Sequence, residues 1–302
     1  MNPFAGTSSR ILNSGARLVY SLRTVGVIRT LRELGPRVRY QFSRMTRRSP
    51  AHPPDLRTIE TCDWVRSLHQ IDVGQRSISA VELSSFLSES RYPRYFYRRN
   101  RRIRYALWHY VGFELCALQD NAVVLDVGAQ GGVWGRIARR RFGCTVSDVD
   151  LRYPPGQNGH RIGASAASIP LPPCSLSHIV SFCSFNCFER DGDIGLLREA
   201  RRLLRVGGCL VIVPLCIGAQ HVNLFDPALV EGDASFDAGA CRIPWPGWGN
   251  NFGRWYNAQA FTDRVLNHLH GFAGVIWNVV HPFHAATGST SFYAALLRKN
   301  VP

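Results

Sequence analysis

The stretch NAVVLDVGAQGG, residues Asn121–Gly132, decides the fold of this 302-residue chain. Its apolar run Val123–Leu125 has no polar face, which is typical of a parallel strand covered on both sides. Asp126 ends that run, and a loop with three glycines in five residues begins at Gly128, where the backbone can adopt conformations that a Cβ would block. The stretch therefore predicts a buried strand that turns sharply into a helix. Such a corner can hold a nucleotide-like ligand, although an ordinary strand-to-helix turn gives a similar pattern.

The chain after this corner alternates between helix and strand patterns. The expected elements are a helix at 134–141, strands at 143–150 and 178–182, a helix at 194–205 and a strand at 209–215. The pair Gly207-Gly208 is expected to end the second helix, whose leucines fall on one face. This alternation is the signature of an α/β fold with a parallel sheet.

The strand at 143–150 ends in a carboxylate, Asp150, close to 20 residues after the glycine loop. In dinucleotide-binding folds a carboxylate about 20 residues on accepts hydrogen bonds from a ribose. Asp150 is therefore a candidate for gripping the diol of a nucleoside ligand.

Four segments carry a family resemblance: LDVGAQGG, the strand ending VSDVD, GASAASIPLP at 163–172, and LLREARRLLRVGGCLVIVP at 196–214. Their order and spacing resemble class I S-adenosylmethionine-dependent methyltransferases, in particular the methyltransferase type 11-like family. The resemblance covers residues 107–215 well and the tail to residue 298 more loosely. It implies a Rossmann-like seven-stranded sheet, mostly parallel with an antiparallel end hairpin, and S-adenosyl-L-methionine as the cofactor.

The resemblance also implies which residues hold that cofactor. Asp126 closes the first motif, Asp150 matches the carboxylate that takes both ribose hydroxyls, and Ser165 and Ala166 stand beside the adenine. From the methionine end to the adenine, the expected cofactor-binding residues are Asp126, Gly128, Ala129, Gln130, Gly132, Asp150, Leu151, Ser165 and Ala166.

Three departures from the family pattern concern the cofactor and the reacting methyl group. Gln130 replaces the middle glycine, and Ser165 replaces the adenine-side carboxylate. Both changes would weaken cofactor binding without abolishing it. Asn186-Cys187 stands where the family usually has Glu-His, which removes the imidazole that normally lies beside the transferring methyl.

Residues 216–256 form a Gly/Pro/Trp-rich insertion that would lie over the carboxyl ends of the strands, where α/β sheets bind ligands. Arg254 and Tyr256 match an Arg-x-Tyr pattern of the family, and with Asn186 and Cys187 they are the expected acceptor-binding residues. The two tryptophans at 245 and 248 fit either this site or a local core. A helix at 258–269 is expected next. Strands at 274–281 and 291–298 then form the antiparallel end hairpin that completes the fold.

The expected reaction is in-line displacement, in which the protein holds acceptor and methyl group at attack distance and excludes water. An oxygen acceptor would also need a general base, and Glu189 and His221 are the candidates. The acceptor is expected to be a small molecule or a glycan. A catalytically degenerate fold that serves as a binding module at a membrane is the alternative.

Composition fits one globular enzyme with a basic extension. The formal charge of +15 comes almost entirely from arginine, since Lys299 is the only lysine. Nine cysteines without a C-x-x-C pair indicate free thiols, most of them buried, in a reducing cytosol, so we expect a cytoplasmic protein without a metal site. No apolar run reaches the 18 residues that a transmembrane helix needs.

The first 50 residues form a basic amphipathic extension. Residues 10–34 alternate apolar side chains with arginines, which fits a helix on an anionic membrane surface. A helix that covers the catalytic domain and an organellar transit peptide are the competing interpretations. Prolines at 50, 53 and 54 begin a linker, so the predicted division is 1–50, a linker with helices that lead into the core at 51–104, and the methyltransferase domain at 105–302.

A second basic run, residues 91–102, mixes arginines with aromatic side chains. That mixture can bind phosphate and stack on bases, but it also fits a helix that leads into the catalytic core and covers the cofactor. The chain has no Asn-Pro-Pro-Tyr-like tetrad for amino methylation. We therefore do not expect a nucleic-acid substrate and keep an RNA methyltransferase only as an alternative.

Overall fold

A computed structural model describes residues 63–92, 99–129, 132–230, 236–246 and 248–301. The predictions for the N-terminal extension at 1–50, for Gln130 and for the centre of the aromatic-basic run at 93–98 lie outside these residues. Among the described residues, no helix is both long and apolar enough to cross a membrane.

Helices and strands alternate along the described chain. In order they are η1 (Trp64–Ser67), β1 (Asp72–Ser77), α5 (Ala80–Glu89), α6 (Arg99–Cys116), β2 (Val123–Val127), α7 (Val133–Phe142), β3 (Thr145–Val149), β4 (Gly156–Asn158), β5 (Arg161–Gly163), β6 (Leu176–Phe182), η2 (Phe185–Cys187), α8 (Gly192–Leu203), β7 (Leu204–Leu215), β8 (Val222–Phe225), β9 (Cys241–Pro244), β10 (Gly253–Trp255), α9 (Ala258–Arg264), η3 (Leu266–His268), β11 (Phe272–Val280), α10 (His284–Thr287) and β12 (Ser291–Lys299).

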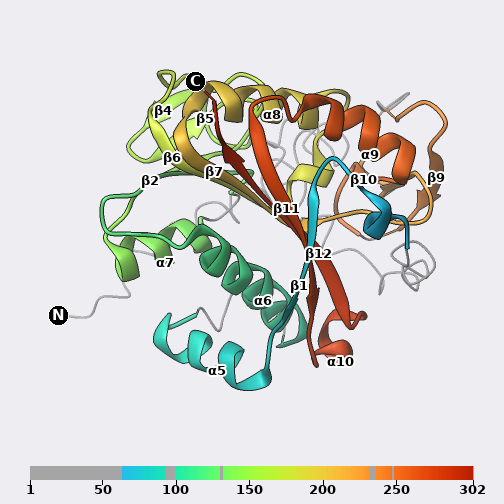
Figure 1. Ribbon diagram of the computed structural model, residues 1–302, viewed down its shortest axis with the longest axis horizontal. Coiled ribbons are helices and arrows are strands. Elements are labelled where there is room, and N and C mark those ends of the chain that lie inside the picture. Colours follow the sequence, from blue (N-terminus) through green and yellow to red (C-terminus); the bar gives the residue numbers. More distant parts are fainter. Residues whose placement is uncertain (1–62, 93–98, 130–131, 231–235, 247, 302) are drawn as a thin grey trace, which may run out of the picture. The chain divides into compact units, whose positions relative to one another are not determined.

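Nine of these strands form one twisted sheet in the order β1-β11-β12-β7-β6-β2-β3-β5-β4 (Figure 1). β12 runs antiparallel to both of its neighbours, and β4 runs antiparallel to β5. The other neighbouring pairs are parallel. The prediction of a Rossmann-like methyltransferase sheet, mostly parallel with an antiparallel end hairpin of β11 and β12, is confirmed.

The sheet is wider than the seven strands expected. β1 pairs with β11 at one edge and β4 pairs with β5 at the other. β1 lies in the region 51–104, which the sequence pattern assigned to a linker and leading helices. Its burial alternates without a strong apolar face, because an edge strand needs fewer apolar side chains, and this weak pattern hid it.

Two apolar cores cover the two faces of the sheet. Leu125 of β2 belongs to the core beneath α8 and α9, whereas the adjacent Val124 belongs to the core beneath α5, α6 and α7. Figure 1 shows these two groups of helices on opposite sides of the sheet. Since successive side chains of a strand point to opposite faces, Asp126 points to the α7 side together with Val124.

Helix α8 ends earlier than the Gly-Gly pair predicts. Its last residue is Leu203, and Leu204 is already extended and paired with Leu176 of β6. The register then shifts before His178 pairs with Cys209, and Gly207 has a φ of +80° in this irregular part of β7. The two glycines therefore lie in an irregular part of β7 and do not end the helix. The helix ends before them because Leu204 already pairs with β6.

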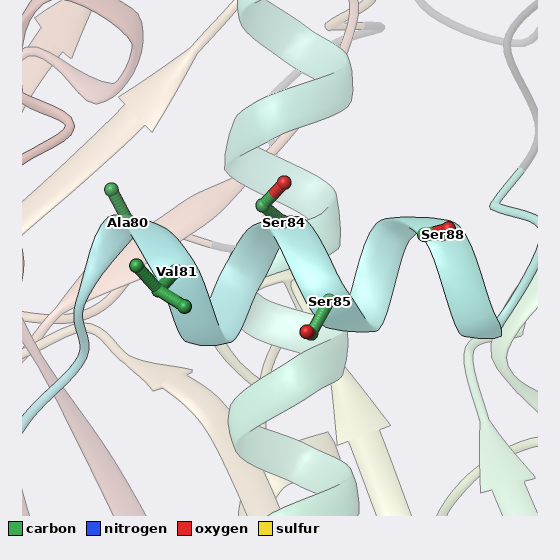
Figure 2. A pocket seen from close by; sticks show the side chains of 5 residues that line it. All are labelled: Ala80, Val81, Ser84, Ser85 and Ser88. Carbon is green, nitrogen blue, oxygen red and sulfur yellow. The ribbon is translucent and has the colours of Figure 1, made fainter.

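Helix α5 starts with a capping box, in which Ser79 and Glu82 each bond the other's backbone N–H. Its outer side bears a shallow hollow lined by Ala80, Val81, Ser84, Ser85 and Ser88 (Figure 2). These described lining residues include no charged side chain, so the hollow has little to offer the predicted chemistry.

Helix α8 packs against the 164–168 segment at a point that leaves no room for a side chain. A Cβ on Gly195 would lie 2.3 Å from the Cβ of Ala167. This contact holds the segment that carries Ser165 and Ala166 against the helix.

We predict that Gly195→Ala lowers the free energy of unfolding by about 1–3 kcal/mol, the usual cost of overpacking. Helix propensity alone would favour alanine by about 1 kcal/mol. A destabilised variant therefore indicates overpacking, and a stabilised variant indicates that helix propensity dominates. Ala167→Gly in the same chain should restore only part of the loss, because it removes the opposing Cβ but leaves the Cα of residue 167 at 2.9 Å from the new methyl group. Urea unfolding of the two single variants and the double variant gives the answer, and a stabilising Gly195→Ala would contradict this packing.

Candidate functional site

The strand order reverses at β2. From β2 the chain passes through α7 to β3 on one side, whereas β6 lies on the other side of β2. In open α/β sheets ligands bind outside the carboxyl ends of the strands at such a reversal. The candidate site is therefore expected where the loops after β2 and β6 begin.

These two loops touch each other directly. Gly128 follows β2 with a φ of +73°, and a Cβ there would lie 2.3 Å from the Cβ of Ser184. Ser184 follows β6, and its Oγ donates a 2.7 Å hydrogen bond to the carbonyl of Val127. Both the backbone conformation and the contact therefore require glycine at position 128.

The glycine loop is also joined to the end of β3. The N–H groups of Gly128 and Ala129 donate to the carbonyl of Val149, at 2.8 and 3.4 Å. The next residue, Asp150, is 9% exposed, and its Oδ1 accepts a 2.8 Å hydrogen bond from the backbone of Arg152. The structure thus brings Gly128, Ala129 and Asp150 to one edge of the sheet, as the motif spacing predicts. Leu151, in contrast, is 76% exposed.

The predicted adenine-side residues lie just after β5, the next strand along. Asp150 donates its N–H to Ile162 of β5 at 3.1 Å. Ser165 accepts a hydrogen bond from the N–H of Ala167 at 3.2 Å, which closes a tight turn, and Ala166 is buried. The candidate cofactor residues therefore follow the ends of three adjacent strands, β2, β3 and β5.

Two carboxyl groups lie buried beneath the glycine turn. Asp126 of β2 is paired in register with Asp148 of β3, so both side chains point to the α7 side. A Cβ on Gly132, at the start of α7, would lie 2.4 Å from Oδ2 of Asp148. Asp148 has Arg139 at 3.7 Å and His160 at 3.5 Å, while its buried Oδ1 has no hydrogen-bond partner among the described residues.

Burial dominates the electrostatics of these carboxyls. It raises the pKa of Asp126 well above the ordinary value, and the nearby Asp148 raises it further, against a smaller opposing effect of Arg139. Burial also raises the pKa of Asp148, although Arg139 and His160 act in the other direction. The sequence analysis placed Asp126 beside the ligand. In the structure its side chain faces the first turn of α7 and accepts a hydrogen bond from the N–H of Gly135.

We predict that Asp148→Asn stabilises the protein at neutral pH. A carboxyl with a higher pKa in the folded chain stabilises the fold fully only below its unfolded pKa, and this contribution is lost as the pH rises through the folded pKa. The variant should gain on the order of 1 kcal/mol at pH 7.5, with the gain shrinking toward pH 4, since each pH unit between the two pKa values is worth about 1.4 kcal/mol.

Urea unfolding at several pH values measures this gain. Asp263→Asn on α9 is the control, because the carboxylate of Asp263 is exposed and should give no such trend. A difference between the Asp148 variant and the parent that does not change with pH would contradict the prediction.

The loop after β6 carries the predicted acceptor-side residues Asn186 and Cys187. Both belong to η2, and Asn186 is 6% exposed. The thiol of Cys187 points back to the carbonyl of Cys183 at 3.6 Å. Burial raises the pKa of Cys187 to about 12. The thiol is therefore protonated at neutral pH and supplies no base in place of the family's imidazole.

Glu189, the first candidate base, is exposed and lies just beyond η2. Its Oε1 accepts a short hydrogen bond from the side-chain amide of Asn251, which precedes β10. One end of the 216–256 insertion thus contacts the loop after β6.

The insertion folds into a small three-stranded sheet in the order β10-β8-β9. Arg254 of β10 is fully buried, and its guanidinium forks onto Asp237 through two 2.6 Å hydrogen bonds. It also donates to the carbonyls of Phe188 and Arg190, at 3.0 and 2.9 Å. These two carbonyls flank Glu189, so one buried cation joins the insertion to the loop after β6.

A second carboxylate completes this buried network. Asp193 of α8 lies 3.0 Å from Nη1 of Arg254 and accepts a 2.7 Å hydrogen bond from the hydroxyl of Tyr256. Arg264 of α9 bonds the same carboxylate at 2.7 Å. Tyr256 is fully buried, and burial together with Asp193 raises the pKa of its hydroxyl well above the ordinary value.

His221, the second candidate base, contacts the other end of the network. Its Nε2 lies 3.1 Å from Oδ2 of Asp237, and its side chain is 13% exposed. Burial would raise the pKa of Asp237, but hydrogen bonds from Arg254 and His221 outweigh it, and the pKa lies well below the ordinary value.

The structure thus gathers all the predicted acceptor-side residues around one network, but in unequal roles. Arg254 and Tyr256 expose no surface and bond the buried carboxylates of Asp237 and Asp193, and the acceptor role predicted for them stays a prediction. Trp245 and Trp248 stack at 5.7 Å within the small core of the insertion. Sequence reasoning missed Asp193, Asp237, Asn223 and Asn251, because single polar residues outside a motif give no signal before the fold brings them together.

Eight cysteines in the described residues are free thiols, and Cys174 and Cys241 are exposed rather than buried. No group of three or more histidine, cysteine, aspartate or glutamate side chains in that part of the chain is arranged to hold a metal ion.

We predict that Arg254→Lys lowers the free energy of unfolding by about 2 kcal/mol or more, because lysine cannot reproduce the fork and leaves buried acceptors unpaired. Arg201→Lys on the exposed side of α8 is the control and should change stability by no more than about 0.5 kcal/mol. Chemical unfolding of both variants makes the comparison. Equal, small effects would show that the buried contacts of Arg254 contribute little, as some buried ion pairs do.

No protein-family model matches the chain, and no curated protein matches it. Among solved structures, it is similar to a Burkholderia thailandensis 1,6-didemethyltoxoflavin-N1-methyltransferase, with 19% identity, a TM-score of 0.41 and coverage of 74% of this chain and 88% of that one. It is also similar to a geranyl diphosphate C-methyltransferase of Streptomyces coelicolor, with 13% identity, a TM-score of 0.42 and coverage of 83% and 100%. Similarity of this degree assigns no residue role and no activity to this chain.

Proposed function

We propose that this protein transfers the methyl group of S-adenosyl-L-methionine to a small-molecule acceptor. The main support is the corner at the strand-order reversal. There Gly128 lets the loop after β2 pack against Ser184, the turn into α7 offers backbone N–H groups, and Asp150 lies one residue beyond the carbonyl that bonds the glycine loop.

The residues at this corner fit the cofactor by chemistry and by space. Gly128 and Gly132 both have positive φ values, and a Cβ at either would collide with its neighbour. The two glycines thus let the turn pack closely against Ser184 and Asp148, and a methionine moiety would lie over the backbone of this turn. Asp150 would hold the ribose through its carboxylate, and Ser165 and Ala166 would border the adenine.

The cofactor supplies the electrophile, a methyl group on a sulfonium that is its own leaving group. The protein therefore needs no covalent intermediate. Its residues must orient the acceptor, exclude water and take a proton from the acceptor where one is released, and positioning of this kind can lower the barrier by several kcal/mol.

The acceptor would bind between η2 and the insertion. Asn186 provides an amide close to the reacting end, and Glu189 and His221 provide basic atoms on the two sides of the Arg254 network. Both a small molecule and a glycan unit are compatible with such polar groups. An acceptor carried at a membrane would involve residues 10–34, which lie outside the described part of the chain.

A binding module without catalysis is the second candidate. The protonated thiol of Cys187 and the hydroxyl of Ser165 favour it, because neither replaces the family's imidazole or carboxylate. The two candidates differ in turnover.

Incubation with S-[methyl-2H3]-adenosylmethionine and the small-molecule fraction of the source cells tests this difference by mass spectrometry. A product heavier by the labelled methyl group supports the enzyme. Cofactor binding without any labelled product would favour the binding module.

We predict that Asp150→Ala weakens S-adenosylmethionine binding by about 1.5–3 kcal/mol, the range for hydrogen bonds to a charged group. Asp148→Asn is the matched control, since Asp148 lies on the same strand face but beneath the glycine turn and should leave the affinity nearly unchanged. Isothermal titration measures both. Equal losses at the two positions would show that the ribose carboxylate has been misplaced.

A further inference from the structure

We propose that His221 is the general base of the site, that Asp237 orients it, and that the acceptor is therefore a hydroxyl group. The proton of that hydroxyl would pass to Nδ1 of His221. This inference rests on the proposed methyl transfer and adds the class of acceptor and a positioning residue, Asp237. Its starting point is the 3.1 Å contact between Nε2 of His221 and Oδ2 of Asp237.

The hydrogen bonds around Asp237 settle which nitrogen of His221 carries the proton. Oδ2 accepts from Nε of Arg254 at 2.6 Å and from the amide of Asn223 at 2.9 Å, and Oδ1 accepts from Nη2 of Arg254 at 2.6 Å. A carboxylate held by a guanidinium in this way stays ionised and can only accept hydrogen bonds. Nε2 of His221 must therefore carry a proton, and in the neutral imidazole this leaves the lone pair on Nδ1.

Asp237 itself is held firmly. Its N–H donates to the side-chain oxygen of Asn223 at 2.8 Å, and Asn223 is fully buried in β8. The carboxylate is thus fixed by the backbone at one end and by Arg254 at the other. A histidine oriented by a fixed carboxylate keeps one tautomer and one ring direction, which is what a general base requires.

His221 and Asp237 lie at the same end of the sheet as the glycine corner, the end where the carboxyl ends of the parallel strands meet. His221 follows the carboxyl end of β7 by six residues, and Gly218 in between is bonded to Tyr256. Arg254 joins Asp237 to the carbonyls of Phe188 and Arg190, which follow the carboxyl end of β6. Through one guanidinium the imidazole is therefore tied to the loop that bears Asn186.

His221 suits proton transfer better than Glu189. Among the described residues no group hydrogen-bonds Nδ1 of His221, and the 13% exposed side chain is accessible without being fully solvated. Glu189 is exposed and is engaged by Asn251.

A base of this kind suits a hydroxyl acceptor better than an amine or a thiol. A neutral hydroxyl is a poor nucleophile unless its proton leaves as it attacks, whereas a neutral amine attacks through its own lone pair and a thiol ionises readily. In the step proposed, the acceptor oxygen forms a bond to the methyl carbon, and the carbon–sulfur bond breaks with its electron pair on sulfur. The hydroxyl proton goes to Nδ1 of His221, whose imidazolium Asp237 stabilises.

The tautomer can be tested without any acceptor. Nitrogen-15 NMR of the full-length protein labelled at histidine should show His221 protonated at Nε2 and bare at Nδ1 at neutral pH, with His221→Gln identifying its signals. Asp237→Asn should shift the ring toward a mixture of tautomers. A proton on Nδ1 of His221 in the parent protein would overturn the proposal, whatever the protein catalyses.

The acceptor class can be tested with the labelled product. In the reaction of S-[methyl-2H3]-adenosylmethionine with the small-molecule fraction of the source cells, fragmentation should locate the labelled methyl on oxygen. A methyl on nitrogen, sulfur or carbon would overturn this inference and leave methyl transfer intact. Failure to bind S-adenosylmethionine in a titration would instead overturn the proposed function.

Two matched variants then separate base catalysis from structure. His221→Gln keeps a side-chain N–H for Asp237 but has no base, so kcat should fall by about 100-fold or more, with unchanged cofactor affinity and melting temperature. His270→Gln, an exposed position outside the network, should keep the parent rate. The acidic limb of the kcat profile against pH should disappear in His221→Gln. A variant that keeps the parent rate and pH profile would overturn the role of His221.

Discussion

The reversal of strand order between β2 and β6 is the constraint on which the rest of the structure depends. At this reversal the loops that follow the carboxyl ends of β2 and β6 leave the sheet. The two loops meet so closely that a side chain at Gly128 would collide with Ser184. The end of β3 is drawn to the same point by two hydrogen bonds to Val149. The corner that these contacts build carries Asp150 one residue beyond Val149.

This arrangement has an electrostatic cost beneath the corner. Asp126 and Asp148 are buried next to each other, burial raises the pKa of both carboxyls, and Asp148 raises that of Asp126 further. Arg139 offsets part of that cost from α7. Buried charged groups of this kind are common at functional sites, which need polar groups that the fold itself does not.

The second support of the site is the buried guanidinium of Arg254. Two carboxylates and two carbonyls surround it, so the small sheet of the insertion is bound to the loop after β6 by polar contacts in a water-poor environment. Replacing such a group by an apolar one can be nearly neutral for stability. The contribution of Arg254 is therefore better explained by position than by stability, since its guanidinium holds the carboxylate of Asp237, which orients His221.

The sequence by itself determined the α/β fold and the corner that carries the candidate cofactor site, because apolar runs, glycines and Asp150 follow one another at short range and act through local backbone rules. It did not reveal the edge strand β1, whose pairing with β11 is decided about 200 residues along the chain. Nor did it reveal the pairing of His221 with Asp237. Polar partners far apart in sequence leave no periodic pattern, and only tertiary packing, which buries Arg254 and removes it from direct contact with a ligand, decides which of them meet.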